Sequence, residues 1–386
     1  MTPAARLAAA AGVLDDVLGG EPAERALLRW SRGARYAGSK DRAAVRDHVF
    51  DALRRRRSLG WLGGSETGRG LVLGALRAAG FDPATLMTGE GHALPPPRDE
   101  EGPRELAEAP EGVRLDVPDW LLPRLRASLG ADFEGACKAL RERAPVHLRA
   151  NLLKATRDGA ARTLAEEGIE SEPVAGIATA LAVTRGAGAV ARSRAYAEGL
   201  VELQDASSQA AVLALPLKDG DRVLDLCAGG GGKTLAMGAR ARLRLHAHDA
   251  EPRRMADLPT RAARAGLAVK VLAEPRACAP FDLVLVDAPC SGSGTWRRTP
   301  DAKWRLTPER LASLLSLQSE LIEEAADLVS PGGHLAFATC SILDEEGPSQ
   351  ATGFLARGPG WAEEGRFVAR PGPRGDGFFQ AVLRRS

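Results

Sequence analysis

Short apolar runs alternate with segments of helical spacing through the second half of the chain. Such runs, rich in Leu and β-branched residues, are typical of parallel strands buried on both faces. Strands that alternate with helices predict a parallel, doubly wound α/β sheet. Two further runs predict a terminal hairpin on one edge of that sheet. The expected strands are residues 222–226, 243–248, 268–272, 281–286 and 335–338, and the hairpin is 366–369 with 378–383.

The first half of the chain has a different pattern. Residues 1–90 have apolar positions at helical spacing and predict an all-helical domain. Residues 91–115 are rich in proline and acidic residues, which is typical of a linker. Residues 116–200 predict connecting helices followed by a small α+β module, with a strand at 146–154 and a helix at 156–167. The α/β domain then occupies residues 201–386.

Charge is unevenly distributed along a chain that is nearly neutral as a whole. The 386 residues include 52 Lys and Arg and 50 Asp and Glu. The segment from Arg29 to Arg57, however, contains ten basic residues and only three aspartates. We expect a helix capped by Ser39 to run through the arginines at 54–57, which either compensate the helix dipole or contact RNA. The surrounding basic segment favours RNA.

Cysteine usage and hydropathy limit the class of protein. The five cysteines are scattered and form no CxxC pair, so a disulfide framework or a zinc site is not expected. Reduced thiols indicate the cytoplasm. The N-terminus does not resemble a signal peptide, and no apolar run approaches the roughly 20 residues of a spanning helix. We expect a cytoplasmic protein without a metal or a membrane partner.

A glycine loop follows the first expected strand, in the sequence Asp225-Leu-Cys-Ala-Gly-Gly-Gly-Gly-Lys-Thr234. A phosphate-binding P-loop requires glycine at position 227, where this chain has Cys227. Backbone without Cβ atoms still lets a nucleotide-like ligand approach closely. Asp249, at the end of the second expected strand, could accept hydrogen bonds from ribose hydroxyls. A nucleoside cofactor such as S-adenosylmethionine fits this pattern at least as well as a dinucleotide.

Three thiols stand where expected strands end, namely Cys227, Cys290 and Cys340, whereas Cys137 and Cys278 fit small buried apolar positions. Methylation at C5 of a pyrimidine needs a thiolate that adds to C6, a group that removes the C5 proton, and a carboxylate that stabilises the adduct. Asp287, Cys290 and Cys340 could supply these roles. The residues alone leave open which thiol attacks.

Several motifs together resemble the Sun/RsmB family of RNA cytosine-5 methyltransferases, from about residue 144 to the C-terminus. The helices of residues 1–90 are similar to the NusB-like RNA-binding domain of bacterial members, and the module within 116–200 then implies a second RNA-binding element. The motifs are Asp287-Ala-Pro-Cys-Ser-Gly, Thr339-Cys340-Ser341, Asp225-Leu-Cys-Ala with Gly-Gly-Lys-Thr, Asn151 to Lys154, Gln204-Asp205 with Ser208-Gln209, Asp301-Ala-Lys303-Trp304 and Gly375-Asp-Gly-Phe-Phe.

The resemblance implies a Rossmann-like methyltransferase domain and a role for each site residue. Cys340 is then the nucleophile, Cys290 assists product release, Asp287 contacts the base, and Lys233 points toward the reaction centre. The implied cofactor is S-adenosylmethionine, and the implied partner is RNA, in particular ribosomal RNA. We expect the protein to be a monomer. The residues implied around the cofactor are Cys227, Ala228, Gly229, Gly230, Gly231, Gly232, Lys233, Asp249, Glu274 and Asp287.

Two departures from the family pattern concern the cofactor. The family's loop usually has Ala-Pro where this chain has Gly229-Gly230, which adds conformational entropy that is lost on ordering. Glu274 stands where members usually have an aspartate that contacts the adenine.

The role of Lys303 is open from the sequence. It either contacts RNA, holds its loop, or is a plain surface lysine.

Two alternative functions remain open from the sequence. One is a non-catalytic RNA-binding or ribosome-assembly factor whose altered glycine loop no longer binds cofactor, although the retention of both cysteines argues against it. The other is a DNA cytosine-5 methyltransferase.

Overall fold

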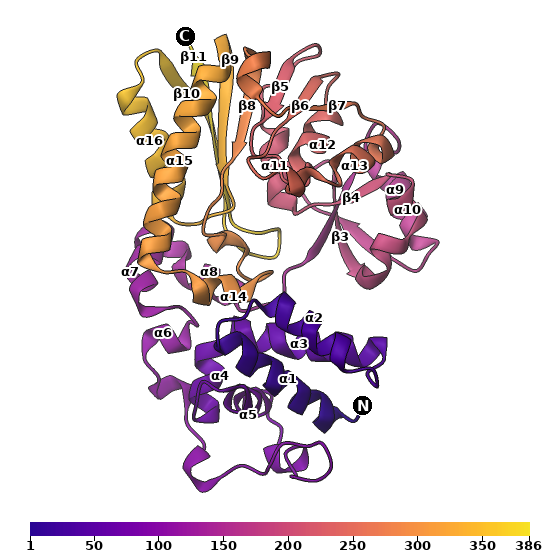
Figure 1. The fold of residues 1–386 in the computed structure, drawn as a ribbon, viewed down its shortest axis with the longest axis vertical. Coiled ribbons are helices and arrows are strands. Elements are labelled where there is room, and N and C mark those ends of the chain that lie inside the picture. The colour runs from indigo at the N-terminus through magenta and orange to yellow at the C-terminus, as the bar shows by residue number, and fades with distance from the viewer. The chain divides into compact units, whose positions relative to one another are not determined.

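Two groups of residues pack around separate cores in the computed structural model, which describes residues 1–386. The helical unit consists of residues 1–143 and 296–306, and the sheet unit consists of residues 144–295 and 307–386 (Figure 1). The segment 296–306 therefore belongs to the helical unit, although the chain on either side of it belongs to the sheet unit. The functional boundaries at residues 90, 115 and 200 stay predictions.

The sheet unit is built on a seven-stranded sheet in the order β10-β11-β9-β8-β5-β6-β7. The strands from β7 to β9 are parallel, whereas β11 is antiparallel to both β9 and β10. The predicted doubly wound sheet and its edge hairpin are thereby confirmed. The strands are β5 (Arg222–Asp225), β6 (Arg244–Ala247), β7 (Val269–Val271), β8 (Phe281–Asp287), β9 (Val329–Thr339), β10 (Trp361–Ala369) and β11 (Phe378–Arg385).

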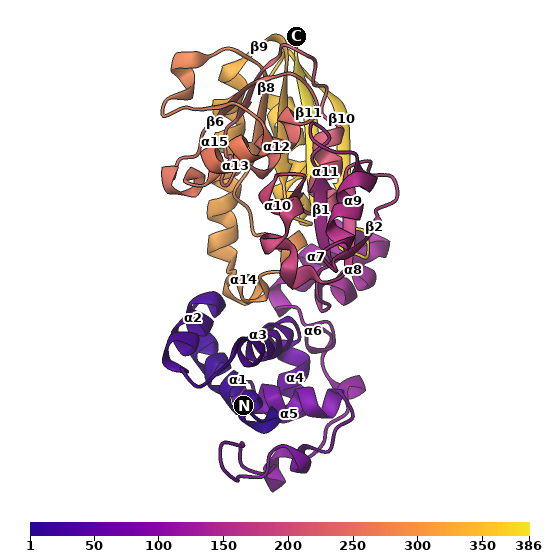
Figure 2. The same cartoon turned by 90° about the vertical axis from the view of Figure 1, so that its right-hand side faces the viewer.

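Helices cover both faces of this sheet because side chains alternate along its strands. Val284 and Val286 of β8 pack in one core with Ile322 of α15, whereas Leu283 and Leu285 pack in a second core on the opposite face, with α11 and α12. In Figure 1, α15 and α16 lie on one side of the strands and α11, α12 and α13 on the other, and Figure 2 shows the same elements turned by 90°. The helices are α11 (Ala206–Leu213), α12 (Gly232–Gly238), α13 (Leu258–Ala265), α15 (Pro308–Leu328) and α16 (Pro348–Arg357).

A smaller antiparallel sheet, in the order β2-β3-β1-β4, precedes the large one. The strand predicted at 146–154 is too long, because β1 ends at Ala150. Asn151 then turns the chain by accepting a hydrogen bond from the Leu153 amide at 3.2 Å. The elements of this module are β1 (Val146–Ala150), α9 (Arg157–Ala165), β2 (Glu170–Pro173), β3 (Ala180–Arg185), α10 (Arg194–Ala197) and β4 (Val201–Leu203).

The helical unit contains the expected N-terminal helices and extends well past them. An apolar core unites α1, α2, α3 and α5. None of the helices in the chain is both long enough and apolar enough to cross a membrane. The helices of this unit are α1 (Pro3–Leu18), α2 (Ala23–Gly33), α3 (Ser39–Arg54), α4 (Arg56–Gly63), α5 (Gly68–Ala78), α6 (Glu111–Arg114), α7 (Leu122–Leu129), α8 (Phe133–Leu140) and α14 (Pro300–Arg305).

The helix predicted to run from a Ser39 cap through the arginine run is corrected in two places. Gly38 occupies the cap position, and its amide donates to Asp41 Oδ2 at 3.1 Å. The helix then ends at Arg54, because Arg55 has non-helical angles of φ −119° and ψ 32°, and α4 begins at Arg56.

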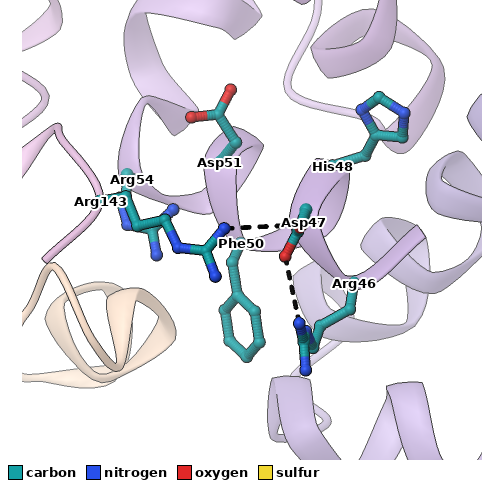
Figure 3. A pocket seen from close by; sticks show the side chains of 7 residues that line it. All are labelled: Arg46, Asp47, His48, Phe50, Asp51, Arg54 and Arg143. Atoms are coloured by element: carbon teal, nitrogen blue, oxygen red, sulfur yellow. Dashed lines mark hydrogen bonds and ion pairs between the residues drawn. The ribbon is translucent and has the colours of Figure 1, made fainter. Parts of the chain in front are cut away.

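The four arginines of the run are held inside the helical unit. Arg54 is buried, lines a hollow of the helical unit (Figure 3), and donates to the Arg297 carbonyl at 2.7 Å. The next three arginines pair with carboxylates, which are Asp51, Glu66 and Asp119 respectively. Arg54 therefore does not lie at a solvated helix end, whereas RNA contact by the three partly exposed arginines stays a prediction.

Lys303 is likewise buried, only 2% exposed, and its ammonium donates to the Asp116 carbonyl at 2.6 Å. It therefore holds the segment 296–306 within the helical unit, and its interpretation as a surface lysine is wrong.

Candidate active site

The predicted site residues follow strands whose carboxyl ends meet at one edge of the sheet, where parallel α/β sheets place their ligands. Asp287 is the last residue of β8, and Cys290 lies three residues further on. Cys340 directly follows β9, which is the neighbour of β8. Lys233 lies in the first turn of α12, which follows β5 on the other side of β8. The topology therefore brings these four residues to one place.

The two thiols face each other, with 3.4 Å between Cys290 Sγ and Cys340 Sγ. A hydrogen bond from the Cys290 thiol lowers the pKa of Cys340, and the nearby Lys233 charge acts in the same direction. The pKa of Cys290 is raised by the same bond and by burial, with a further contribution from the Glu346 carboxylate. The arrangement therefore favours a thiolate on Cys340 and a proton on Cys290.

Lys233 and Asp287 form an ion pair beside the thiols, with 2.5 Å between Nζ and Oδ2. The Lys233 ammonium also lies 5.0 Å from the centre of the Phe378 ring. Burial alone would lower the pKa of Lys233, but the charge of Asp287 and its hydrogen bond outweigh burial, so the pKa is raised. Lys233 is therefore a fixed cation that orients the Asp287 carboxylate.

A buried carboxylate that the sequence reasoning missed joins the two cysteine loops. Glu346 is fully buried and accepts hydrogen bonds from the Ser291 amide at 2.7 Å and the Ser341 hydroxyl at 2.6 Å. The Ser291 hydroxyl also donates to it, and Gln318 of α15 donates at 3.1 Å. Because Ser291 follows Cys290 and Ser341 follows Cys340, this carboxylate fixes the spacing of the thiols. The serine after each cysteine was the available signal.

The glycine loop is shaped by left-handed backbone and by contacts with Asp249. Gly229 and Gly231 have φ angles of 50° and 78°. The Gly229 amide donates to Asp249 Oδ2 at 2.9 Å. The same carboxylate accepts from the Glu251 amide at 3.0 Å and pairs with Arg254 at 3.0 Å. Asp249 therefore supports the loop from the end of β6, and its hydrogen bonding to ribose hydroxyls stays a prediction.

Two arginines, also missed by the sequence reasoning, hold carbonyl groups of the same loop; Arg149 is buried and Arg261 is partly buried. Arg149 of β1 donates to the Gly232 carbonyl at 2.9 Å, and Arg261 of α13 donates to the Gly230 carbonyl. Glu202 pairs with Arg261 at 3.3 Å. These contacts restrict a loop in which Gly229-Gly230 lacks the proline ring of the family pattern.

Three further residues were predicted to surround the cofactor, namely Cys227, Ala228 and Glu274. Burial raises the pKa of Cys227, so it fits a small apolar residue packed against the core rather than a reactive thiol. Ala228 donates its amide to the His248 carbonyl at 2.9 Å, which ties the loop to the end of β6. Glu274 is exposed after β7 and accepts from the Arg276 amide at 3.2 Å. Its contact with adenine stays a prediction.

The loop and its surroundings fit S-adenosylmethionine, which carries a cationic amino acid end and a nucleoside end. Asp225 Oδ2 accepts from the Thr234 hydroxyl at 2.6 Å, whereas its buried Oδ1 has no hydrogen-bond partner. A Cβ atom at Gly232 would meet no heavy atom closer than 3.9 Å, so the loop leaves room there. Among the described residues, no group of three or more His, Cys, Asp or Glu side chains is placed to hold a metal ion.

The doubly wound sheet, the glycine loop and the residues at its edge define an S-adenosylmethionine-dependent methyltransferase. Residues 212–382 match the family described as 16S rRNA methyltransferase RsmB/F, and residues 117–190 match the ferredoxin-like domain of RsmF/B-like methyltransferases. The chain belongs to the RsmB/F family.

Relatives and solved structures agree with this membership. The Ribosomal RNA small subunit methyltransferase B of Citrobacter koseri is 35% identical over 295 residues, covering 72% of this chain and 69% of the relative. That of Salmonella arizonae is 35% identical over 291 residues, covering 71% and 68%. The crystal structure of PH0851 has a TM-score of 0.78 at 25% identity and covers 100% of this chain and 99% of its own. NSun6 from Pyrococcus horikoshii, solved with SFG, has the same fold with a TM-score of 0.62 at 17% identity, covering 70% and 98%.

Proposed function

We propose that this protein methylates C5 of a cytosine in ribosomal RNA, in the cytoplasm, as a monomer. The observation that carries the proposal is the 3.4 Å separation of two thiols beside an oriented carboxylate. One thiol can attack the cytosine ring, while the second can assist release of the methylated product. Ribosomal RNA is supported by the relatives, which are named for methylation of the small-subunit RNA.

The proposed reaction begins when the Cys340 thiolate adds to C6 of the cytosine. The C5–C6 double bond is then replaced by a C6–S bond, and C5 becomes nucleophilic. When bound, S-adenosylmethionine supplies an electrophilic methyl group to C5. Solvent water then takes the C5 proton, the electron pair of the C5–H bond restores the C5–C6 double bond, and the pair of the C6–S bond leaves with Cys340 as its thiolate.

The other residues serve the base and its proton. Asp287 can meet N3 or the exocyclic amine of the cytosine, held in orientation by Lys233. In this proposal Cys290 assists release as a hydrogen-bond donor: its raised pKa keeps the thiol protonated, and the thiol can stabilise the Cys340 thiolate as it leaves the ring. A splayed-out base is needed for this geometry, because C5 and C6 of a stacked cytosine cannot reach thiols that are partly buried at the edge of the sheet.

Replacement of each thiol separately tests the proposed roles. Cys340→Ala should abolish turnover without trapping RNA, whereas Cys290→Ala should accumulate a covalent protein–RNA adduct, visible as a slower band in a denaturing gel with labelled RNA. Cys278→Ala is the control, because this thiol belongs to a turn at the opposite end of β8, and it should do neither. Adducts formed by the Cys340 variant would reverse the assignment.

Matched RNA and DNA substrates test the substrate class. With tritiated S-adenosylmethionine, label should enter ribosomal RNA and not DNA of the same sequence, and label in DNA alone would refute the proposal. Bisulfite sequencing of the treated RNA should reveal one protected cytosine, and label without a protected cytosine would exclude C5.

A further inference from the structure

The two thiols of the candidate site form an adjacent pair, which offers chemistry besides methyl transfer. Cys290 Sγ and Cys340 Sγ are 3.4 Å apart, and a disulfide needs about 2.05 Å, so the sulfur atoms would have to approach by about 1.4 Å. The backbone already lies close, because the Gly294 amide donates to the Cys340 carbonyl at 3.0 Å. Glu346 also accepts hydrogen bonds from the residue that follows each cysteine. A disulfide between the two thiols therefore requires no approach of distant segments.

The pair has the properties of an oxidation-sensitive site. Both cysteines are partly exposed, so a small oxidant can reach them. The hydrogen bond from Cys290 and the charge of Lys233 lower the pKa of Cys340 and favour its thiolate. Cysteines that respond to oxidants typically have a low pKa, are accessible to solvent and stand next to a second cysteine. Cys340 has all three properties.

The other three cysteines do not combine these properties. Burial raises the pKa of Cys137 to about 11, and it raises the pKa of Cys227 as well. Cys278 lies in the turn before β8, whereas Cys290 follows the other end of that strand. A limited amount of oxidant should therefore react first at the pair.

We propose that Cys290 and Cys340 form a reversible oxidation site, at which a hydroperoxide such as hydrogen peroxide joins the two sulfur atoms in a disulfide and stops methyl transfer. Formation of the disulfide does not depend on the proposed function. Only the loss of methyl transfer rests on it, because that reaction needs the Cys340 sulfur as a free thiolate.

The reaction begins when the Cys340 thiolate attacks one oxygen of hydrogen peroxide. An S–O bond forms, the O–O bond breaks, and the leaving hydroxide takes a proton from solvent to become water. Cys290 then gives its proton to solvent, and its sulfur attacks the sulfur of the Cys340 sulfenic acid. The S–S bond forms as the S–O bond breaks, and the second hydroxide also becomes water. Two thiols are thereby oxidised to a disulfide while the peroxide is reduced to two water molecules.

This chemistry gives Cys290 a protective role besides its role in product release. A sulfenic acid without a neighbouring thiol is oxidised further to sulfinic acid, which dithiol reductants do not reverse. With Cys290 at 3.4 Å, the sulfenic acid of Cys340 is instead converted to a disulfide. A dithiol such as dithiothreitol opens this bond by thiol–disulfide exchange and restores both thiols.

The test titrates the full chain with hydrogen peroxide in stoichiometric steps, without RNA or cofactor. Free thiols are then alkylated in denaturant, and the peptides are analysed by mass spectrometry without reduction. The peptides of Cys290 and Cys340 should appear joined, with the loss of two hydrogen atoms, and the number of free thiols should fall from five by two. Methyl transfer should fall in proportion to the joined fraction and should return after dithiothreitol.

Variants separate the pair from the other thiols. Cys290→Ala should form no disulfide, and its Cys340 should accumulate as sulfinic acid that dithiothreitol does not reduce. Cys290→Ser serves as a second version if the alanine variant unfolds, because its hydroxyl keeps a hydrogen-bonding group near Cys340. Cys278→Ala is the matched control, and its Cys290–Cys340 disulfide should form as in the unaltered protein.

Three outcomes would overturn the proposal, namely sulfinic acid at Cys340 of the unaltered protein without any disulfide, a disulfide that forms first between other cysteines, or full methyl transfer by protein whose pair is completely joined. If the disulfide forms and reverses but the reduced protein methylates no cytosine, the proposed function fails and the oxidation site stands. If the reduced protein methylates C5 of cytosine but peroxide never joins the pair, the oxidation site fails and the proposed function stands.

Discussion

Glu346 offers a sharp test of the claim that a buried carboxylate sets the geometry of the two thiols. It receives four hydrogen bonds from Ser291, Ser341 and Gln318, and it has no exposure to solvent. In Glu346→Ala, the hydroxyls of Ser291 and Ser341 can rotate, and the Ser341 hydroxyl keeps a partner in the Ser293 hydroxyl, 2.8 Å away. The Ser291 amide cannot turn in this way, and Gln318 Nε2 would keep only its second bond, to the Pro289 carbonyl at 2.9 Å.

Two buried donors would therefore lose their acceptor. Each such donor costs about 1–3 kcal/mol, so Glu346→Ala should lower the free energy of unfolding by about 2–6 kcal/mol. The loops that carry Cys290 and Cys340 would also lose their common anchor. A displacement of about 1 Å can cost roughly a hundredfold in rate, so we expect methyl transfer to fall by about 10- to 100-fold at saturating substrates.

The assay combines urea unfolding with single-turnover methyl transfer at saturating cofactor and RNA. Glu320→Ala on α15 removes the same side chain from an exposed position and should change stability by less than about 0.5 kcal/mol. Glu346→Gln keeps one acceptor oxygen and should recover part of both losses. A Glu346→Ala protein with unchanged stability, or a destabilised one with an unchanged single-turnover rate, would refute the reasoning.

Two further predictions concern cations that donate to backbone carbonyls. Arg261→Met removes a charge-assisted bond to the Gly230 carbonyl, worth about 1.5–3 kcal/mol. It should weaken S-adenosylmethionine binding roughly tenfold or more by calorimetry while Arg240→Met, away from the loop, does not. Burial lowers the pKa of Lys303 to about 8 from 10.5. The folded protein then binds fewer protons than the unfolded chain between these values, so stability rises with pH across about 8 to 10.5, by about 3 kcal/mol. Lys303→Met should abolish this rise in urea unfolding, and an unchanged rise would contradict it.

The fold was predictable because its signals are local. Apolar runs marked β5 to β9, and the edge hairpin followed from two more runs near the C-terminus. Errors came where local pattern and long-range contact compete. The strand at 146–154 was overextended because Asn151 turns the chain through contacts with distant carbonyls, at Gly199 and Ala265.

The reactive residues of the candidate site were predictable from the sequence, but the residues that hold them in place were not. Asp287, Cys290, Cys340 and Lys233 were found because each stands beside a strand end in a recognisable motif. Glu346 was not found, because its acidic segment Asp344-Glu345-Glu346 has the composition of a surface turn. Burial of its third carboxylate depends on Ser291, 55 residues away in the chain.

By itself, the sequence determined the alternation of strands and helices, the edge at which the thiols gather and the family to which they belong. These features follow from residue types at short spacing, which fix local backbone and burial. Only the tertiary structure decided that Arg54 and Lys303 are buried, and that Arg149 and Arg261 hold the glycine loop. Each of these depends on which distant segment packs against a side chain, and periodicity along the chain carries no information about that partner.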